Sequence, residues 1–186
     1  IGDVAGKGVP ASLLMAKLAA EARYCLLTQP DPARAVSLLN DQLIKGGIGD
    51  RFVTLAALIL DPRADTVTVV NAGHINPLRY KPPGGDLADA VTDAQSGLPL
   101  GLVPGYPYEA VTVPLAPGES LLVFTDGVTD AMSPAGDMYG FGGIRAALTP
   151  DVVIADHRPK GVGDRLVRGV RAHAAGRAQN DDIAVV

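Results

Sequence analysis

The spacing of apolar residues predicts two helices at the start of the chain. Apolar side chains recur every three or four positions in residues 10–27 and again after Pro32, as they do along the buried face of a helix. Asp31 suits a helix cap, Pro32 suits a first helical turn, and the glycines of segment 46–49 end the second helix. The pattern therefore predicts a helical hairpin over residues 10–45.

The middle of the chain has the pattern of strands. Residues 53–60 form a nearly continuous apolar run, which predicts a strand buried on both faces. Residues 66–69 alternate and should pair back on it as a hairpin. Further strands are predicted at 77–81, 110–115, 120–125 and 183–186, helices at 144–148 and 162–175, and surface loops at 82–96 and 133–143. Strands joined by hairpins imply antiparallel sheets with helices packed outside, an α+β fold.

Composition and charge remove several classes of function. A length of 186 residues suits one or two domains, and 22 Gly with 15 Pro favour many short elements. The formal net charge of −4 argues against a nucleic-acid binder, and no apolar run approaches the roughly 20 residues of a membrane span. The single cysteine excludes an internal disulfide framework, and Cys25 is expected in the core rather than as a nucleophile.

Four short segments combine Asp or Asn with glycine and polar residues. They are GDVAGKG at 2–8, NAGH at 71–74, TDGVTD at 125–130 and QNDDI at 179–183. Three of them place a carboxylate where a buried strand emerges, and carboxylates gathered there repel each other unless a cation lies among them. Oxygen ligands without cysteine suit Mg²⁺ or Mn²⁺. Each Asp alone could be an ordinary turn former, but three together favour a metal site.

Two other polar residues have two interpretations each. Lys7 does not belong to a phosphate-binding P-loop, because only three residues separate Gly2 from Gly6 and Gly8 follows the lysine. Lys7 could still attract phosphate, or it could be an exposed loop cation. His74 could lie near a metal site, or it could secure a turn through a hydrogen bond.

Taken together, the motifs resemble those of the metal-dependent protein phosphatase (PPM, type 2C) family, and above all its bacterial SpoIIE-like branch. The matching segments are 2–11, 71–77, 97–101, 125–131 and 181–183, which occur in the family's order across nearly the whole chain. The resemblance implies an αββα sandwich, in which two antiparallel sheets are flanked by helices. It also implies that residues 1–186 form one phosphatase domain that lacks its N-terminal strands and an earlier acidic metal motif.

The resemblance further implies two Mn²⁺ or Mg²⁺ ions. Asp3 matches the carboxylate that bridges both ions, and the Val4 carbonyl matches a further ligand. Asp126 and Asp181 match ligands of one ion.

Two acidic residues near these ligands have open roles. Asp182 competes with Asp181 for the same ligand position. Asp130 is similar to an acid that holds metal-bound water or a weaker third ion.

The function implied by the resemblance is that of a cytoplasmic, bacterial-type Ser/Thr protein phosphatase. Its substrate would be a phosphorylated regulatory protein, such as an anti-sigma-factor antagonist, hydrolysed by a metal-activated water without a phosphoenzyme. The proton donor to the leaving group stays unassigned, because Ala5 stands where eukaryotic relatives place His. Two alternatives are an inactive pseudophosphatase used as a regulatory binding module and a hydrolase of small phosphoesters.

The helical hairpin over residues 10–45 joins directly to Asp3. The resemblance implies that this hairpin acts as a regulatory switch and as a dimer contact, under the control of an upstream sensory region.

Overall fold

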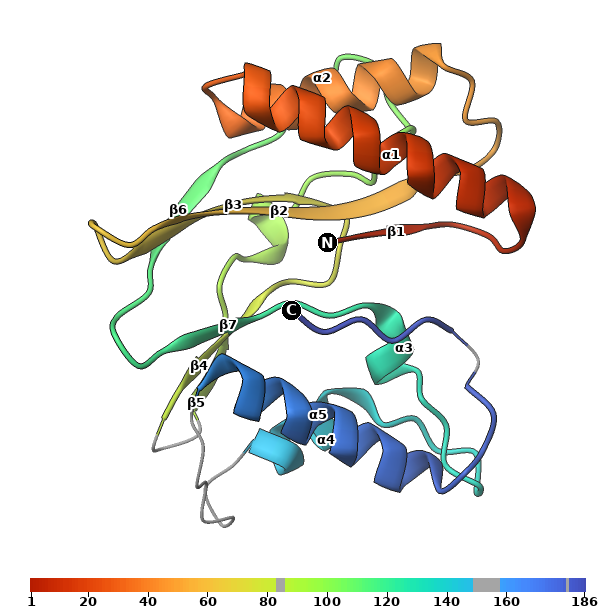
Figure 1. Cartoon of the computed structure of the whole chain (residues 1–186), viewed down its shortest axis with the longest axis vertical. Coiled ribbons are helices and arrows are strands. Elements are labelled where there is room, and N and C mark those ends of the chain that lie inside the picture. The colour runs from red at the N-terminus through yellow and green to blue at the C-terminus, as the bar shows by residue number, and fades with distance from the viewer. Residues whose placement is uncertain (83–85, 149–157, 180) are drawn as a thin grey trace. The chain divides into compact units, whose positions relative to one another are not determined.

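The computed structural model describes residues 1–82, 86–148, 158–179 and 181–186. The chain divides into two units (Figure 1). The first comprises Ile1–Asn76 and Val91–Pro114, and the second comprises Pro77–Ala90 and Leu115–Val186.

The first unit is built on a four-stranded antiparallel sheet. Its strands are β1 (Gly2–Val4), β2 (Val53–Asp61), β3 (Thr66–Ala72) and β6 (Val111–Pro114), in the order β1-β2-β3-β6. Asp3 pairs with Thr54, and further along the sheet Ala57 pairs with Val70. Strand β1 is thus an edge strand whose register on β2 fixes the backbone around Asp3.

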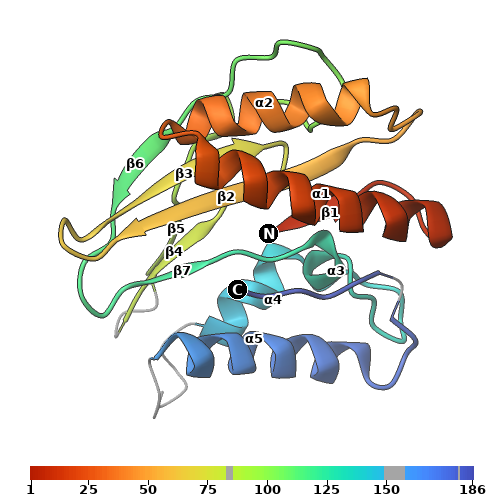
Figure 2. The same cartoon turned by 45° about the horizontal axis from the view of Figure 1, so that its top comes forward.

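Helices α1 (Val9–Thr28) and α2 (Pro32–Lys45) lie side by side over one face of this sheet (Figures 1 and 2). Both begin with the predicted prolines, and Asp31 caps α2 by accepting a hydrogen bond from the Ala33 amide at 2.9 Å. The core between helices and sheet includes Leu14, Leu18, Cys25, Ala35, Leu39, Leu43, Val53, Leu55, Ala57 and Val70. The predicted hairpin and the buried position of Cys25 are confirmed.

Strand β2 is buried over only part of its length. Val53, Leu55, Ala56 and Ala57 are buried, whereas Ile59 is 45% exposed and Leu60 is 67% exposed. Figure 1 shows the tip of the β2–β3 hairpin reaching beyond the ends of α1 and α2. The prediction of a strand buried on both faces is therefore wrong for its last residues, because the helices do not cover them.

In its described residues, the second unit carries a three-stranded antiparallel sheet and three helices. The strands are β4 (Leu78–Lys81), β5 (Asp86–Asp89) and β7 (Ser120–Leu122), in the order β5-β4-β7, and the helices are α3 (Asp126–Thr129), α4 (Gly140–Leu148) and α5 (Pro159–Ala174). Large buried side chains from both include Tyr80, Leu122, Phe124, Ile144, Leu148 and Leu166. The predicted α+β class, with two antiparallel sheets and helices, is confirmed.

Three predicted segments need correction. Residues 82–96, expected to be a loop, include strand β5 and the 3-10 helix Asp93–Gln95, while residues 83–85 lie outside the described residues. The helix expected at 144–148 begins earlier, at Gly140. Residues 183–186 form a single bridge between Val185 and Phe124 instead of a strand, because hydrogen bonds of the Thr125 hydroxyl replace part of the ladder.

Helix α1, at 20 residues, is the longest helix of the described residues. Among those residues, no helix combines the length and the apolar character needed to cross a membrane.

Candidate metal centre

Three of the predicted site carboxylates lie together in the second unit. Asp126 opens helix α3, Asp130 follows its last residue, and Asp181 comes from the C-terminal segment. Partial burial raises the pKa of Asp126 above its ordinary value, and the negative charges of Asp181 and Asp130 raise it further. Two backbone hydrogen bonds oppose this shift. The carboxylates therefore repel one another, and a bound cation would relieve that repulsion.

The hydroxyl of Thr125 joins the two segments that carry these acids. It donates a hydrogen bond to the Asp182 carbonyl at 2.6 Å and accepts one from the Ala184 amide at 3.0 Å. The Thr125 amide also donates to the Ala184 carbonyl at 3.2 Å. Thr125 thus fixes the C-terminal segment beside the start of α3, and with it the spacing of Asp126 and Asp181.

Gly127 allows the same segments to approach closely. A Cβ atom at this position would lie 2.4 Å from the Asp182 carbonyl oxygen and 3.1 Å from that of Asp181. Both distances involve backbone atoms, which cannot swing aside as the end of a side chain can. Sequence reasoning placed Thr125 and Gly127 inside a motif but missed these roles, because the sequence alone does not show which distant segment returns to this turn.

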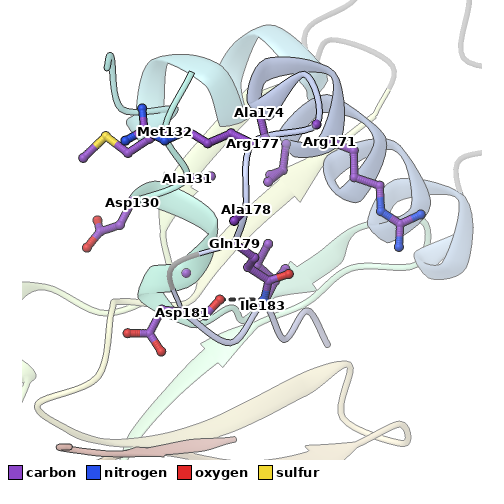
Figure 3. A pocket seen from close by; sticks show the side chains of 13 residues that line it. Asp130, Ala131, Met132, Arg171, Ala174, Arg177, Ala178, Gln179, Asp181 and Ile183 are labelled. Atoms are coloured by element: carbon purple, nitrogen blue, oxygen red, sulfur yellow. Dashed lines mark hydrogen bonds between the residues drawn. The ribbon is translucent and has the colours of Figure 1, made fainter. Parts of the chain in front are cut away.

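The structure distinguishes Asp181 from Asp182. The Asp181 charge raises the pKa of Asp126, and Asp181 lines a pocket that Asp130 also lines. Figure 3 shows the carboxyl groups of Asp130 and Asp181 projecting to the same side. Gln179 holds the Asp181 backbone by donating to its carbonyl at 2.6 Å, and Asp181 Oδ1 accepts from the Asp182 amide at 2.9 Å. Asp181 is therefore the acid whose charge reaches Asp126 and whose side chain lines this pocket.

Asp3 belongs to the first unit and is held by a regular sheet. It lies directly opposite Thr54 on β2, and its own Oδ1 accepts a hydrogen bond from the Val4 amide at 2.9 Å. The next residue, Ala5, donates to the Phe52 carbonyl at 2.9 Å. The predicted bridging carboxylate and the three acids of the second unit are thus held by different units of the chain.

His74 takes one of its two expected roles. The residue is buried, its amide donates to Asn71 Oδ1 at 2.9 Å, and its carbonyl accepts from Asn71 Nδ2 at 2.9 Å. Its Nδ1 lies 3.0 Å from Thr54 Oγ1. His74 therefore secures the turn after β3. Lys7 lies exposed in the segment between β1 and α1.

The donor chemistry of the acidic cluster fits a hard cation. Its side-chain donors are carboxylate oxygens only, and Mn²⁺ and Mg²⁺ prefer oxygen ligands. Within the described residues, however, no group of three or more His, Cys, Asp or Glu side chains is already placed to hold a metal ion. The cluster therefore has the negative charge that would attract a hard cation, but its acids are not already arranged around one ion position.

A family model described as "Stage II sporulation protein E (SpoIIE)" matches residues 1–186. Two curated relatives also match. The chain is 26% identical over 140 residues to phosphoserine phosphatase RsbU of Bacillus subtilis, which covers 73% of this chain and 40% of RsbU. It is 28% identical over 153 residues to protein IcfG of Synechocystis, which covers 82% of this chain and 23% of IcfG. The matches thus span less than half the length of either relative.

Solved structures with the same fold include two PP2C phosphatase domains. The SiaA-PP2C domain of Pseudomonas aeruginosa matches with a TM-score of 0.79 and 21% identity, over 99% of this chain and 72% of that one. The PP2C domain of SpoIIE from Bacillus subtilis, with a fragment of its regulatory domain, matches with a TM-score of 0.76 and 19% identity, over 99% and 51%. RsbX in complex with magnesium matches with a TM-score of 0.65 and 16% identity, over 99% and 76%.

Proposed function

The chain belongs to the Stage II sporulation protein E (SpoIIE) family, and we propose that it acts as a metal-dependent protein-serine/threonine phosphatase. One observation in the structure supports this proposal above all. Asp126, Asp130 and Asp181 are grouped in the second unit, where partial burial raises the pKa of Asp126 and the charges of Asp181 and Asp130 raise it further. Such repulsion destabilises a folded protein that binds no cation, whereas a bound cation offsets it.

The proposed ligands are those implied by the family motifs. Asp3 would bridge two Mn²⁺ or Mg²⁺ ions, the Val4 carbonyl would be a further ligand, and Asp126 and Asp181 would hold one of the ions. Magnesium is named for one solved neighbour, RsbX, which supports this choice of ion. When bound, the ions supply a water of lowered pKa and neutralise charge on the phosphoryl oxygens.

The chain's own residues have three tasks in this proposal. Thr125 and Gly127 keep the segment that carries Asp181 against the turn that carries Asp126. Asp126 has to be ionised to act as a ligand, so its raised pKa means that low pH should oppose metal binding. Asp130 would accept a hydrogen bond from water and so orient it. The donor of a proton to the leaving serine oxygen is left unassigned.

The proposed substrate is a phosphoserine or phosphothreonine in a regulatory protein of the cytoplasm. Support comes from RsbU, which is named a phosphoserine phosphatase. An anti-sigma-factor antagonist is the substrate type that the family resemblance suggests.

Helices α1 and α2 are proposed as the contact through which an upstream sensory region and a second copy of the chain act. Val9, Leu13, Tyr24 and Leu27 on α1 are at least 60% exposed, which is unusual for four large apolar side chains on one helix. Sedimentation velocity of the wild type and of Leu27→Ser would test the dimer: the variant should shift toward monomer, and an unchanged distribution would contradict this contact.

The test of the function is phosphate release from a phosphoserine protein, with Mn²⁺ and with EDTA. Release should require Mn²⁺ and fall at least about 100-fold in Asp126→Asn, as expected when a positioned electrostatic group is lost. Asp164→Asn is the matched control, because Asp164 is an exposed acid of the same unit that pairs with Lys160 on α5. Release that is equal in both variants would contradict the proposed site.

An inactive binding module is the second candidate, and one observation favours it. In the described residues, the acids do not form a ready-made metal group. Calorimetric titration with Mn²⁺ separates the candidates: saturable binding that Asp126→Asn weakens supports the phosphatase. A folded protein that binds neither Mn²⁺ nor Mg²⁺ and releases no phosphate from several phosphoproteins would favour the module.

A further inference from the structure

A pocket of about 250 Å³ lies in the second unit beside the acidic cluster (Figure 3). Asp130 and Asp181 both line it. Most of its remaining wall is apolar and is formed by Ala131, Met132, Val170, Ala174, Ala178 and Ile183. An apolar pocket therefore opens directly beside the carboxylates of the proposed metal site.

The walls of this pocket are held by hydrogen bonds of their own. Arg177 Nη1 donates to the Ser133 carbonyl at 2.8 Å, and His173 Nε2 lies 2.9 Å from the Asp137 carbonyl oxygen. The Tyr139 amide donates to the Ala131 carbonyl at 2.9 Å. These bonds tie the segment after α3 to the C-terminal end of α5. A pocket built in this way loses little conformational entropy when it is filled.

Charged residues lie on two sides of the pocket. Asp130 and Asp181 project to one side, and Arg171 lies on the opposite side in Figure 3. Arg177 also lines the pocket, but its guanidinium donates to the Ser133 carbonyl. With a cation bound, the acidic side attracts a phosphate group, while the guanidinium of Arg171 attracts a carboxylate. The apolar wall between them disfavours a charged side chain, which would lose its hydration there. The pocket thus suits a peptide with phosphate, aliphatic and acidic groups in close succession.

We propose that this pocket binds an aliphatic side chain of the phosphoprotein substrate, one or two residues from the phosphoserine, with an acidic residue of the substrate facing Arg171. The inference rests on the proposed function, because it places the phosphoserine at Asp130 and Asp181. Consecutive Cα atoms are about 3.8 Å apart, so a neighbouring residue reaches a pocket that those two acids themselves line. The site selects substrates by the residue next to the phosphoserine.

The aliphatic side chain should contribute most of the selectivity. Hydrophobic pockets discriminate by about 10- to 200-fold for a methylene group, so a leucine at the right position should raise kcat/KM at least about 10-fold over alanine. Arg171 is exposed, and an exposed ion pair contributes little. Replacing the acidic residue should therefore lower kcat/KM by only about two- to five-fold.

The experiment uses phosphoserine peptides in an alanine background, each with one leucine at −2, −1, +1 or +2. Phosphate release by the protein with Mn²⁺ gives kcat/KM for each peptide, and one position should stand out. Ala174→Leu fills the pocket and should remove the preference for that leucine. Ala172→Leu makes the same change at an exposed position of the same helix that does not line the pocket, and should keep the preference.

A second measurement separates this inference from the proposed function. The same peptides, with the phosphoserine replaced by a non-hydrolysable phosphonate, are tested for binding by fluorescence anisotropy. Leucine-dependent binding that Ala174→Leu removes would support the pocket even if no peptide were hydrolysed, and only the phosphatase proposal would fail. Equal hydrolysis and equal binding of all peptides would overturn the pocket proposal and leave the phosphatase standing. Ala178→Leu fills the pocket from another wall and serves if Ala174→Leu folds poorly.

Discussion

The two units of the chain hold their acidic residues in different ways. In the first unit, Asp3 lies within strand β1, and the backbone around it is fixed by the antiparallel ladder to β2. In the second unit, Asp126 and Asp181 lie outside the sheet, and their spacing depends on the Thr125 hydroxyl and on the missing side chain at Gly127. Backbone hydrogen bonds between strands tolerate most side-chain substitutions. An arrangement that depends on single side chains can be lost through one substitution.

The first unit uses side chains for a different purpose, which is to hold a long loop. Asn40 on α2 is fully buried, accepts a hydrogen bond from the Gly101 amide at 2.8 Å and donates to the Val103 carbonyl at 2.9 Å. Ser37, one turn earlier, donates to the Tyr106 carbonyl at 3.1 Å. In this unit, polar side chains of α2 hold the loop over residues 101–106, whereas Asp3 is held by the sheet.

The largest effect is expected for Asn40→Ala. It leaves the Gly101 amide and the Val103 carbonyl without their partner, at about 1–3 kcal/mol for each, so the free energy of unfolding should fall by about 2–6 kcal/mol. Urea unfolding measures the loss. Asp41→Ala is the control, because Asp41 accepts from the Gly105 amide at an exposed site where water can replace it, and from Asn40 Nδ2 only at 3.4 Å. Its cost should stay below about 1 kcal/mol. Equal losses in the two variants would show that Asn40 is not the main fastening of the loop.

The comparison of the units is tested most directly by two glycines that neighbour the acids. Gly127→Ala should lower the free energy of unfolding by about 1–3 kcal/mol and weaken Mn²⁺ binding, because the new methyl group meets backbone oxygens. Gly2→Ala, beside Asp3, should change stability by less than about 1 kcal/mol. Its closest atom would be the Thr54 carbonyl oxygen at 3.1 Å, and alanine loses less entropy on folding than glycine. Urea unfolding and calorimetry measure both, and a larger loss in Gly2→Ala would break the comparison.

Much of the fold could be predicted because its signals are local. The bounds of α1 and α2 follow from Pro10, Pro32, the cap at Asp31 and the glycines after residue 45. Strand β5 and the adjacent 3-10 helix were missed, because four residues with one buried side chain become a strand only by pairing with β4. The exposure of Leu60 was also missed, since an apolar run does not reveal where the cover of a sheet ends.

The acidic residues of the candidate site could be proposed from the sequence. The contacts that hold their segments in place could not. Asp126, Asp130 and Asp181 stand in segments whose residue types already suggested a cation site, and the structure groups them. The hydrogen bond from the Thr125 hydroxyl to the Asp182 carbonyl joins residues 57 positions apart, so no local sequence pattern predicts it. The choice between Asp181 and Asp182 depends on which way neighbouring side chains point. The ligand roles of Asp3, the Val4 carbonyl, Asp126 and Asp181, and the role of Asp130, all stay predictions.

A smaller effect is expected for the hydroxyl of Thr125. Thr125→Val keeps the branched shape and removes one donor and one acceptor, so the free energy of unfolding should fall by about 1–2 kcal/mol. The amide of Ala184, which donates to this hydroxyl, should exchange faster with deuterium. Thr125→Ser keeps the hydroxyl and should retain most of the protection. If valine and serine behaved alike, the C-terminal segment would be held by its backbone bonds, as Asp3 is.

The smallest effect is expected for the charge of Asp126 in the metal-free protein. Its pKa in the folded chain is raised above the ordinary value of 3.8 by burial and by the charges of Asp181 and Asp130. Between the ordinary and the raised pKa, the folded state binds more protons than the unfolded state, so stability falls as the pH rises through that window. At pH 7 the ionised Asp126 therefore destabilises the fold, and Asp126→Asn should melt at a slightly higher temperature than the wild type.

Whether Asp126→Asn melts above or below the wild type tests whether repulsion among the three acids destabilises the folded protein. Well below pH 3.8 the advantage of Asp126→Asn should vanish, because the wild-type carboxyl is then neutral in both the folded and the unfolded state. Added salt should also shrink this difference in melting temperature, since Asp126 is only partly buried and its charge is still accessible to ions. Saturating Mn²⁺ should reverse it, because a ligand that binds only the folded wild type stabilises that protein by mass action. Thermal melts of both proteins across pH, with EDTA and with Mn²⁺, measure all three. A variant that melts below the wild type in EDTA at pH 7 would mean that Asp126 is stabilised by its neighbours, and the second unit would then need no cation to hold its acids together.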